Sequence, residues 1–167
     1  MTPNEEKQLK VEEVQLVVFR LRDEEFGLPI NQVTRIVRVP EITKVPEAPG
    51  FIEGVINLRG DVIAVIDLAR QFELPAIAER PASSRIIVAE IGGKPIGLLV
   101  DEVPELVRIA KDDIDPPPEI LQTKVKKEFI SGVGKLKERL LILIEADKLL
   151  EPNEVKQLTQ IKEGGTQ

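Results

Sequence analysis

Cysteine, histidine, tryptophan and tyrosine are absent from this chain of 167 residues, and phenylalanine occurs only five times. Without cysteine, the chain can form neither a disulfide nor a thiolate metal site. Without histidine, it lacks the commonest general base and the commonest metal ligand. The remaining residues include no plausible catalytic constellation. We therefore expect a protein that is not an enzyme and that has no cofactor and no metal site.

A basic excess and a long apolar run are also missing. The formal net charge is −6, whereas a protein that neutralises nucleic-acid phosphates needs a basic face. Few aromatic side chains are available to stack on bases. No apolar run approaches the roughly 20 residues of a membrane helix, and the polar first ten residues do not resemble a signal peptide. These features predict a cytoplasmic protein that binds no nucleic acid and does not insert directly into a membrane.

What the chain does contain is an internal repeat. The segment FIEGVINLRGDVIAVIDL at 51–68 returns as FISGVGKLKERLLILIEA at 129–146. The upstream segments match too, and Val37-Arg38 returns as Val107-Arg108. The offset is 78 residues (129 − 51) for the downstream halves and 70 residues (107 − 37) for the upstream halves. The second copy therefore carries a short insertion, for which the proline-rich run 115–119 is the candidate.

The repeat and the composition divide the chain. A repeat of this length is one compact unit rather than a solenoid turn. We expect copy one at about 14–74 and copy two at about 84–150, joined by a polar connector. The expected divisions are a flexible tail, a two-copy domain, and a C-terminal helix with its tail, at 1–12, 13–152 and 153–167. The helix is predicted because three apolar residues recur at helical spacing: Val155, Leu158 and Ile161.

Short β-branched runs with turn signals about every ten residues predict a mainly β fold of small barrels. The duplication makes this two barrels of about five strands each, and strand exchange between the copies stays an open alternative. Proline interrupts 40–50 and 111–120, which we expect to be irregular. Equivalent strand positions should be buried alike in a common aliphatic core, namely Val55, Ile66, Val133 and Ile144.

Arg59 stands at the predicted tip of a hairpin whose flanking strands are apolar. Gly60 is expected to supply the backbone freedom of the turn. The equivalent residue of copy two is Lys137, so the fold does not require a guanidinium there. Arginine suits a partly buried protein interface, but a solvated turn arginine explains the residue equally well. Both interpretations remain open from the residues alone.

Three segments carry a resemblance to a known family: GVINLRGDVIAVIDL, IGLLVDEV and EFISGVGKLKERLLILIEADKLL. They resemble the CheW-like domain family of chemotaxis coupling proteins, over roughly Val14 to Leu150. The resemblance implies two SH3-like five-stranded barrels around a shared hydrophobic seam. It also implies a non-enzymatic adaptor in arrays beneath the inner membrane. The implied partners are the regulatory domain of the histidine kinase CheA and the cytoplasmic tips of methyl-accepting chemoreceptors.

The resemblance also implies partner-binding positions. They fall after the first hairpin, before and within the NLRG motif, and on a loop of copy two that contributes to ring contacts: Val33, Arg35, Gly54, Arg59, Asp115, Glu119 and Ile120. This chain departs from the family pattern at some of them. Arg35 stands where some members have an acidic residue, and Asp115 and Ile120 replace a basic and an aromatic residue.

An adaptor is one of three functions open to a chain built from such small β-barrels. A receiver-linked regulatory module is not expected, because only 17 residues follow Leu150. A small-molecule-binding or other scaffolding β-barrel remains the alternative, although barrels of five strands are normally filled by their own side chains.

Overall fold

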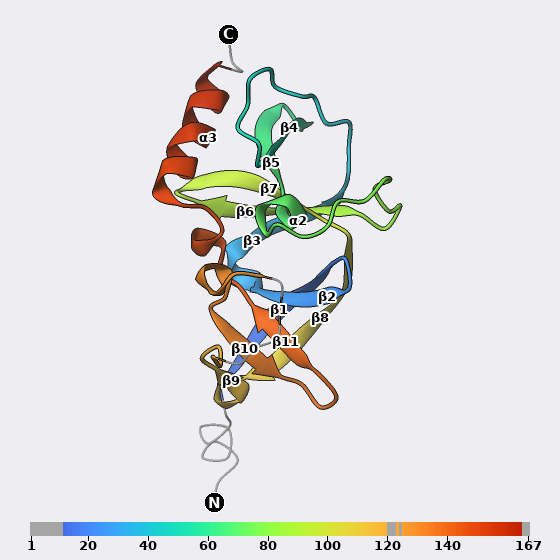
Figure 1. The fold of residues 1–167 in the computed structure, drawn as a ribbon, viewed down its shortest axis with the longest axis vertical. Coiled ribbons are helices and arrows are strands. Elements are labelled where there is room, and N and C mark those ends of the chain that lie inside the picture. The colour runs from blue at the N-terminus through green and yellow to red at the C-terminus, as the bar shows by residue number, and fades with distance from the viewer. Residues whose placement is uncertain (1–11, 120–122, 124, 165–167) are drawn as a thin grey trace, which may run out of the picture.

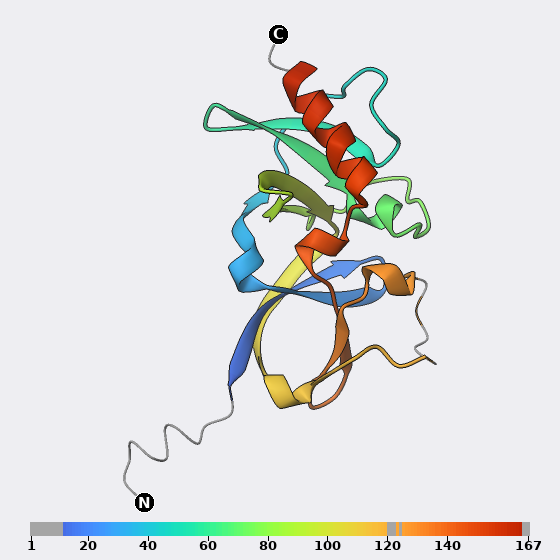
Figure 2. The same ribbon diagram turned by 90° about the vertical axis from the view of Figure 1, so that its left-hand side faces the viewer.

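The chain folds into two β-sheet lobes stacked along the long axis of the molecule, with one helix beside the upper lobe (Figure 1). The structure is a computed structural model that describes residues 12–119, 123 and 125–164. We call the lower lobe of Figure 1 lobe 1 and the upper lobe, which carries the helix, lobe 2. The turned view separates the lobes clearly and shows the helix lying across lobe 2 (Figure 2).

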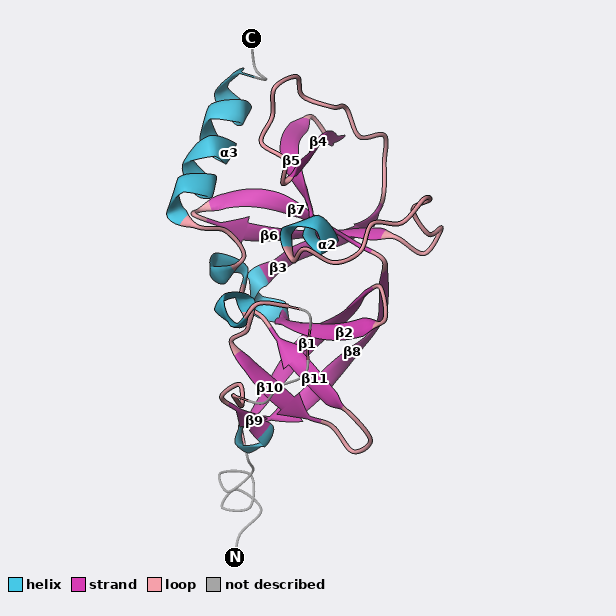
Figure 3. Ribbon diagram, in the orientation of Figure 1, coloured by secondary structure: helices cyan, strands magenta, loops and turns pink. Residues whose placement is uncertain are grey.

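Strands dominate both lobes (Figure 3). Lobe 1 is a sheet in the order β8-β1-β2-β11-β10-β9, with β8 Glu102–Ala110, β1 Glu13–Leu21, β2 Glu24–Pro29, β11 Leu140–Leu143, β10 Gly132–Lys135 and β9 Ile114–Asp115. Lobe 2 is a sheet in the order β3-β6-β7-β5-β4, with β3 Val33–Arg38, β6 Arg85–Ile91, β7 Lys94–Val100, β5 Asp61–Asp67 and β4 Ile52–Leu58. The helices are α2 Leu68–Gln71 and α3 Pro152–Gly164, with short 3₁₀ turns η1 Ile30–Gln32, η2 Lys111–Asp113, η3 Lys127–Phe129 and η4 Ala146–Lys148.

The predicted mainly β fold with a small C-terminal helix is confirmed. One segment expected to be irregular is so only in its second half: within 111–120, the 3₁₀ turn η2 leads into the two-residue strand β9, and residues 116–119 form no helix or strand. Ile114 and Asp115 pair with Gly134 and Val133 of β10. Pairing is possible because these residues precede the prolines and keep their backbone N–H groups. Lobe 1 consequently has one more short strand than the expected five.

Each lobe is built from both copies of the repeat. The sheet orders superpose when β1, β2, β3, β4 and β5 are matched to β6, β7, β8, β10 and β11. In lobe 1, strands β1 and β2 come from copy one, and strands β8 to β11 come from copy two. In lobe 2, strands β6 and β7 come from copy two, and strands β3 to β5 come from copy one. The junctions correspond as well, because β2 pairs in parallel with β11 through Gly27 and Leu143, while β7 pairs in parallel with β5 through Gly97 and Val65. The exchange that the sequence left open is therefore complete and reciprocal.

Gly54 and Gly132 recur in the repeat because a neighbouring backbone passes very close to each. A Cβ on Gly54 would lie 2.4 Å from the carbonyl oxygen of Thr43, and one on Gly132 would lie 2.9 Å from that of Asp115. Thr43 bridges Val55 as Asp115 bridges Val133. The segment 40–50 thus closes lobe 2 over β4 in the way that β9 closes lobe 1 over β10.

The buried apolar side chains of the described residues form three clusters. One lies inside each lobe, and the largest lies in the seam between them. Strand β1 supplies two of these clusters by alternation, since Leu16 and Val18 face the interior of lobe 1 whereas Val17 and Phe19 face the seam. Strand β6 does the same for lobe 2. A strand that is buried on both faces has a continuous apolar sequence instead of an alternating one. This explains the sequences LVVF in β1 and RIIVA in β6.

The few aromatic side chains are concentrated in the seam. Phe19 and Phe26 of lobe 1 stack with ring centroids 5.5 Å apart, and Phe26 lies 5.6 Å from Phe72, which follows α2. Phe72 in turn lies 5.0 Å from Phe129 of η3. Aromatic pairs at such distances contribute about 0.5–1.5 kcal/mol each beyond their buried area. The row therefore ties lobe 1 to the part of copy one that follows β5.

Helix α3 packs on this same seam. Val155 and Leu158, which were predicted to share a helix face, both belong to the seam cluster. The side chain of Ile161 lies outside the described residues. Gln71 of α2 donates hydrogen bonds to the carbonyl of Leu149 (2.9 Å) and to Glu154 (3.1 Å). The helix is thereby fixed to lobe 2 by apolar packing and by a side-chain amide.

The prediction that four equivalent strand positions are buried alike holds for three of them. Ile66 and Ile144 are fully buried in the seam, and Val133 is 4% exposed. Val55 is only half-buried. On β4 the buried positions are Ile52, Gly54 and Ile56, so Val55 faces the other side of the strand.

Truncating the seam should destabilise the whole molecule. We expect Ile66→Ala and Ile144→Ala each to lower the free energy of unfolding by about 2–5 kcal/mol, because each leaves a cavity in a close-packed region. Val55→Ala is the matched control from the same repeat and should cost much less. Denaturant unfolding of all three variants measures this, and equal costs at Ile66 and Val55 would contradict the described packing.

The reciprocal exchange predicts how fragments behave. A cut between Ala78 and Glu79 in the connector separates the two copies without interrupting a strand. Each fragment alone lacks the partner strands of both its sheets, so we expect it to be largely unfolded by circular dichroism. Mixing the fragments should restore the native spectrum. Independent folding of either fragment would show that the copies can pair their strands internally.

Candidate interaction surfaces

Arg59 lies at the exposed tip of the β4–β5 hairpin, in a tight turn. Both central residues have positive φ, 53° for Arg59 and 91° for Gly60. This is the signature of a type I′ turn, for which Asn-Gly is the favoured sequence. The side chain of Asn57 caps the turn by accepting a hydrogen bond from the Gly60 N–H at 2.8 Å.

The turn geometry corrects the expectation that Gly60 alone supplies the backbone freedom, and it supports the interpretation of Arg59 as a contact residue. Gly60 does not supply all of the backbone freedom, because Arg59 also adopts the left-handed conformation. For a residue with a Cβ, that conformation costs roughly 1–2 kcal/mol unless the residue is asparagine or aspartate. Arg59 makes no hydrogen bond or ion pair with the described residues. The fold would therefore favour asparagine at this position, and the guanidinium is free to contact another molecule.

Strand β3 forms one exposed edge of lobe 2. Val33 begins the strand, half-buried against the seam cluster, and Arg35 follows on the exposed surface with no partner among the described residues. The next residue along the strand, Ile36, is 38% exposed. An unpaired strand edge offers backbone donors and acceptors to another chain. This edge therefore combines backbone pairing capacity, an aliphatic contact and positive charge.

Strand β8 forms the equivalent edge of lobe 1. Leu106 occupies the repeat position of Ile36 and is 50% exposed, and Arg108 corresponds to Arg38. The position of Arg35, however, is taken by Glu105, which forms an ion pair with Arg139 of the neighbouring hairpin. The hydrogen bond that Arg139 donates to Glu105 raises the pKa of Arg139 above its ordinary value. The two edges thus share a shape but differ in charge.

The other predicted positions lie elsewhere. Gly54 is buried under Thr43, so any effect on partner binding would act through the position of the loop 40–50. Asp115 is exposed on β9 and forms an ion pair with Lys135 at 3.2 Å. Glu119 is exposed, and Ile120 lies outside the described residues. The predicted positions consequently belong to separate surfaces: the β3 edge, the β4–β5 hairpin and the β9 end of lobe 1.

Sequence reasoning missed the exposed edge residues Ile36, Leu106, Arg38 and Arg108. The repeat contained the signal, since an apolar residue followed two positions later by arginine occurs in both copies. Alternation indicated a half-buried strand, but it did not indicate that the strand would lie at a sheet edge.

The arginines separate into two groups. Six hold the fold through hydrogen bonds or ion pairs: Arg20, Arg22, Arg70, Arg80, Arg85 and Arg139. Four make none with the described residues: Arg35, Arg38, Arg59 and Arg108. Arginine is enriched among residues that dominate binding energy at protein interfaces. The four unpartnered arginines are therefore candidates for contacts with partners.

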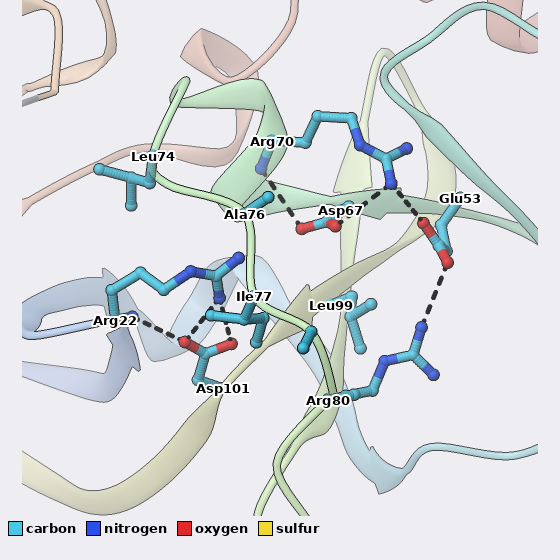
Figure 4. Close-up of a pocket in the computed structure, with 11 residues that line it drawn as sticks. Arg22, Glu53, Asp67, Arg70, Leu74, Ala76, Ile77, Arg80, Leu99 and Asp101 are labelled. Carbon is cyan, nitrogen blue, oxygen red and sulfur yellow. Dashed lines mark hydrogen bonds and ion pairs between the residues drawn. The ribbon is translucent and has the colours of Figure 1, made fainter.

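A pocket of about 270 Å³ lies under the connector between the copies (Figure 4). Arg22 donates hydrogen bonds to the carboxylate of Asp101 from its guanidinium at 2.9 Å and from its backbone N–H at 2.6 Å. Its Nε donates to the carbonyl of Pro75 at 2.7 Å. On the other wall, Glu53 bridges Arg70 at 3.1 Å and Arg80 at 3.2 Å. The charged groups are thus paired with one another across the lobes and the connector.

This pocket gives little support to a ligand-binding barrel. Its charged lining side chains already pair with one another, and the interiors of both lobes are filled by their own apolar clusters. We therefore infer that these ion pairs hold the connector in place against the two lobes. Among the described residues, no group of three or more acidic side chains could hold a metal ion. In the same part of the chain, no helix has the length and apolar character needed to cross a membrane.

Comparisons with known proteins agree with this architecture. The family described as CheW-like domain matches residues 15–154. Chemotaxis protein CheW of Klebsiella aerogenes is 33% identical over 141 residues, covering 84% of each chain, and that of Helicobacter pylori is 35% identical over 146 residues, covering 87% of each. The crystal structure of the scaffolding protein TtCheW from Thermoanaerobacter tengcongensis is 41% identical, with a TM-score of 0.78 over 85% of this chain and 95% of that chain. The chain therefore belongs to the CheW-like domain family.

Proposed function

We propose that the chain is a non-enzymatic adaptor that couples the cytoplasmic tips of methyl-accepting chemoreceptors to the regulatory domain of the histidine kinase CheA. The family membership supports this function, since the relatives are chemotaxis and scaffolding proteins. The adaptor would work in the cytoplasm, at receptor arrays beneath the inner membrane.

The observation that carries the proposal is the pair of equivalent sheet edges with different charges. An adaptor must hold two different partners in one complex, and the duplicated fold provides two surfaces of similar shape. Arg35 leaves the β3 edge positive, whereas Glu105 and Arg139 neutralise each other on the β8 edge. Complementary charge selects partners and suppresses wrong ones. The two edges are therefore suited to two distinct partners.

Arg59 adds a third contact. Its guanidinium stands at the opposite edge of lobe 2 from β3, next to the edge strand β4. A planar fork of donors matches a carboxylate in a bidentate arrangement. We propose an acidic side chain of the receptor tip or of CheA as its partner.

The direct test is binding. The purified chain should bind both a CheA regulatory domain and a soluble receptor-tip fragment, and all three should elute together in size-exclusion chromatography. Incubation with ATP should give neither hydrolysis nor phosphorylation of the chain. Failure to bind either protein, or a stoichiometric ATPase rate, would refute the adaptor function.

Replacing Arg59 should separate binding from stability. We expect Arg59→Asn to keep or raise the free energy of unfolding, by up to about 1 kcal/mol, because asparagine suits the left-handed turn. The same variant should weaken binding of one partner by about 2–5 kcal/mol if the ion pair is desolvated. Calorimetric titration and thermal melting measure the two effects.

Lys137→Asn is the matched control, because Lys137 occupies the equivalent hairpin tip of lobe 1 and is also exposed. It should leave binding nearly unchanged. A lower melting temperature for Arg59→Asn with unchanged binding would make Arg59 a structural residue.

The two edges can be tested as a pair. Ile36→Asp and Leu106→Asp place a charge at equivalent exposed positions, where surface substitutions normally change stability by about 0.5 kcal/mol or less. We expect each variant to weaken a different partner by at least about tenfold, since an aspartate at an apolar contact must be desolvated. Titrations against CheA and the receptor tip would reveal the assignment. Wild-type affinity of both variants for both partners would exclude the edges as contact surfaces.

A further inference from the structure

A second surface feature, which shares only Arg38 with the edge residues of β3 named above, is an open hollow where β3 ends and β6 begins. Its volume is about 620 Å³, and it is lined by eight described residues: Arg38, Val39, Pro40, Arg80, Pro81, Ala82, Ser84 and Arg85. Three of these are arginines and none is acidic. In a chain with a formal net charge of −6, a hollow whose charged lining side chains are all positive is a local reversal of charge.

The strand register makes this concentration of charge costly for the fold. Arg38 and Arg85 are directly opposite each other in the antiparallel pair β3–β6, so their side chains emerge on the same face. Like charges at such positions are destabilising. In the other lobe, the equivalent pair is Arg108 and Gln15. The repeat therefore tolerates a neutral residue at this position, and the second arginine in lobe 2 is not needed for the pairing.

Several donors around the hollow are unused. Arg38 makes no hydrogen bond or ion pair with the described residues. Arg85 uses only one terminal nitrogen, which donates to the carbonyls of Ser84 (2.7 Å), Ser83 (3.1 Å) and, at the longer distance of 3.5 Å, Ala82. Arg80 contacts Glu53 through one nitrogen at 3.2 Å, and Glu53 is not part of the hollow. The guanidinium forks thus retain free N–H groups.

Ser84 provides an independent observation. The residue is 4% exposed and lines the hollow, yet its hydroxyl has no hydrogen-bond partner among the described residues. A buried polar atom without a partner costs free energy, typically about 1–3 kcal/mol. Ser84 belongs to the lining of the hollow, so an acceptor group on a ligand there is one partner for this hydroxyl. A negatively charged acceptor would satisfy the hydroxyl of Ser84 and would also reduce the repulsion between Arg38 and Arg85.

We propose that this hollow binds a phosphate group, with Arg38 and Arg85 as its main ligands and Arg80 and Ser84 as additional donors. Guanidinium groups bind phosphate through paired, charge-assisted hydrogen bonds. A doubly charged group offsets the repulsion between Arg38 and Arg85, and its several oxygens can accept from more than one fork. The group is either inorganic phosphate or the phosphate of a small monoester.

The test uses the full chain and inorganic phosphate at pH 8, with sodium chloride added to keep the ionic strength constant. Heteronuclear NMR should show saturable shifts centred on residues 38, 80, 84 and 85. Arg38→Gln should weaken phosphate binding by about tenfold or more, because a hydrogen bond to a charged group is lost. Without phosphate, its melting temperature should equal or exceed that of the wild type, because a like-charge contact is removed.

Arg108→Gln is the matched control, since it removes the same charge at the equivalent repeat position. It should leave the phosphate affinity within about twofold of wild type, beyond the general effect of net charge. Equal losses in Arg38→Gln and Arg108→Gln, or wild-type shifts that chloride alone reproduces, would overturn the proposal. A linear, non-saturating response would do so as well.

A second titration distinguishes the two forms of the ligand. Glycerol 3-phosphate presents the same group on a small organic body. Tighter binding than inorganic phosphate, by about tenfold, assigns the site to a monoester whose body contacts Val39 and Pro40. Equal or weaker binding assigns it to inorganic phosphate.

Discussion

The structure depends on one apolar seam buried between two sheets. Strands β1 and β6 each place one face inside their own lobe and the other in the seam, so neither sheet can bury both of its faces without its neighbour. The row of phenylalanines also lies in the seam. Packing thereby uses the chain's aromatic residues, and the described surface exposes arginine and aliphatic side chains instead.

Around this symmetric core, the charges are not symmetric. Equivalent positions carry Arg35 and Glu105 on the two edges, Arg59 and Lys137 at the two hairpin tips, and Arg85 and Gln15 beside the unpartnered arginines. The apolar positions of the repeat preserve the fold, because both lobes need the same buried pattern. The exposed positions are free to differ, and these three differences fall on the sheet edges, on the hairpin tips and beside Arg38 and Arg108.

Much of this fold could be predicted from the sequence, because the repeat and the short apolar runs are local signals. The hairpin that carries Arg59 was located in this way. Strand exchange could not be predicted, since β1 and β2 present the same pattern to either set of partner strands. Edge position and register are non-local too, so the exposure of Ile36 and the opposition of Arg38 to Arg85 emerge only in the folded chain. The left-handed turn at Arg59 was missed because the sequence there is not the one such a turn favours.

The reciprocal sharing of strands has a consequence for the origin and assembly of this architecture. One copy alone has no complete sheet, so a single-copy ancestor would fold only as a symmetric, strand-swapped homodimer. Its stability would depend on protein concentration. Joining the copies through the connector makes the association of the two copies intramolecular. For a short flexible linker, the effective concentration of one copy around the other is in the millimolar range. Fusion also allows the two halves to evolve separately, which a homodimer with identical subunits does not permit.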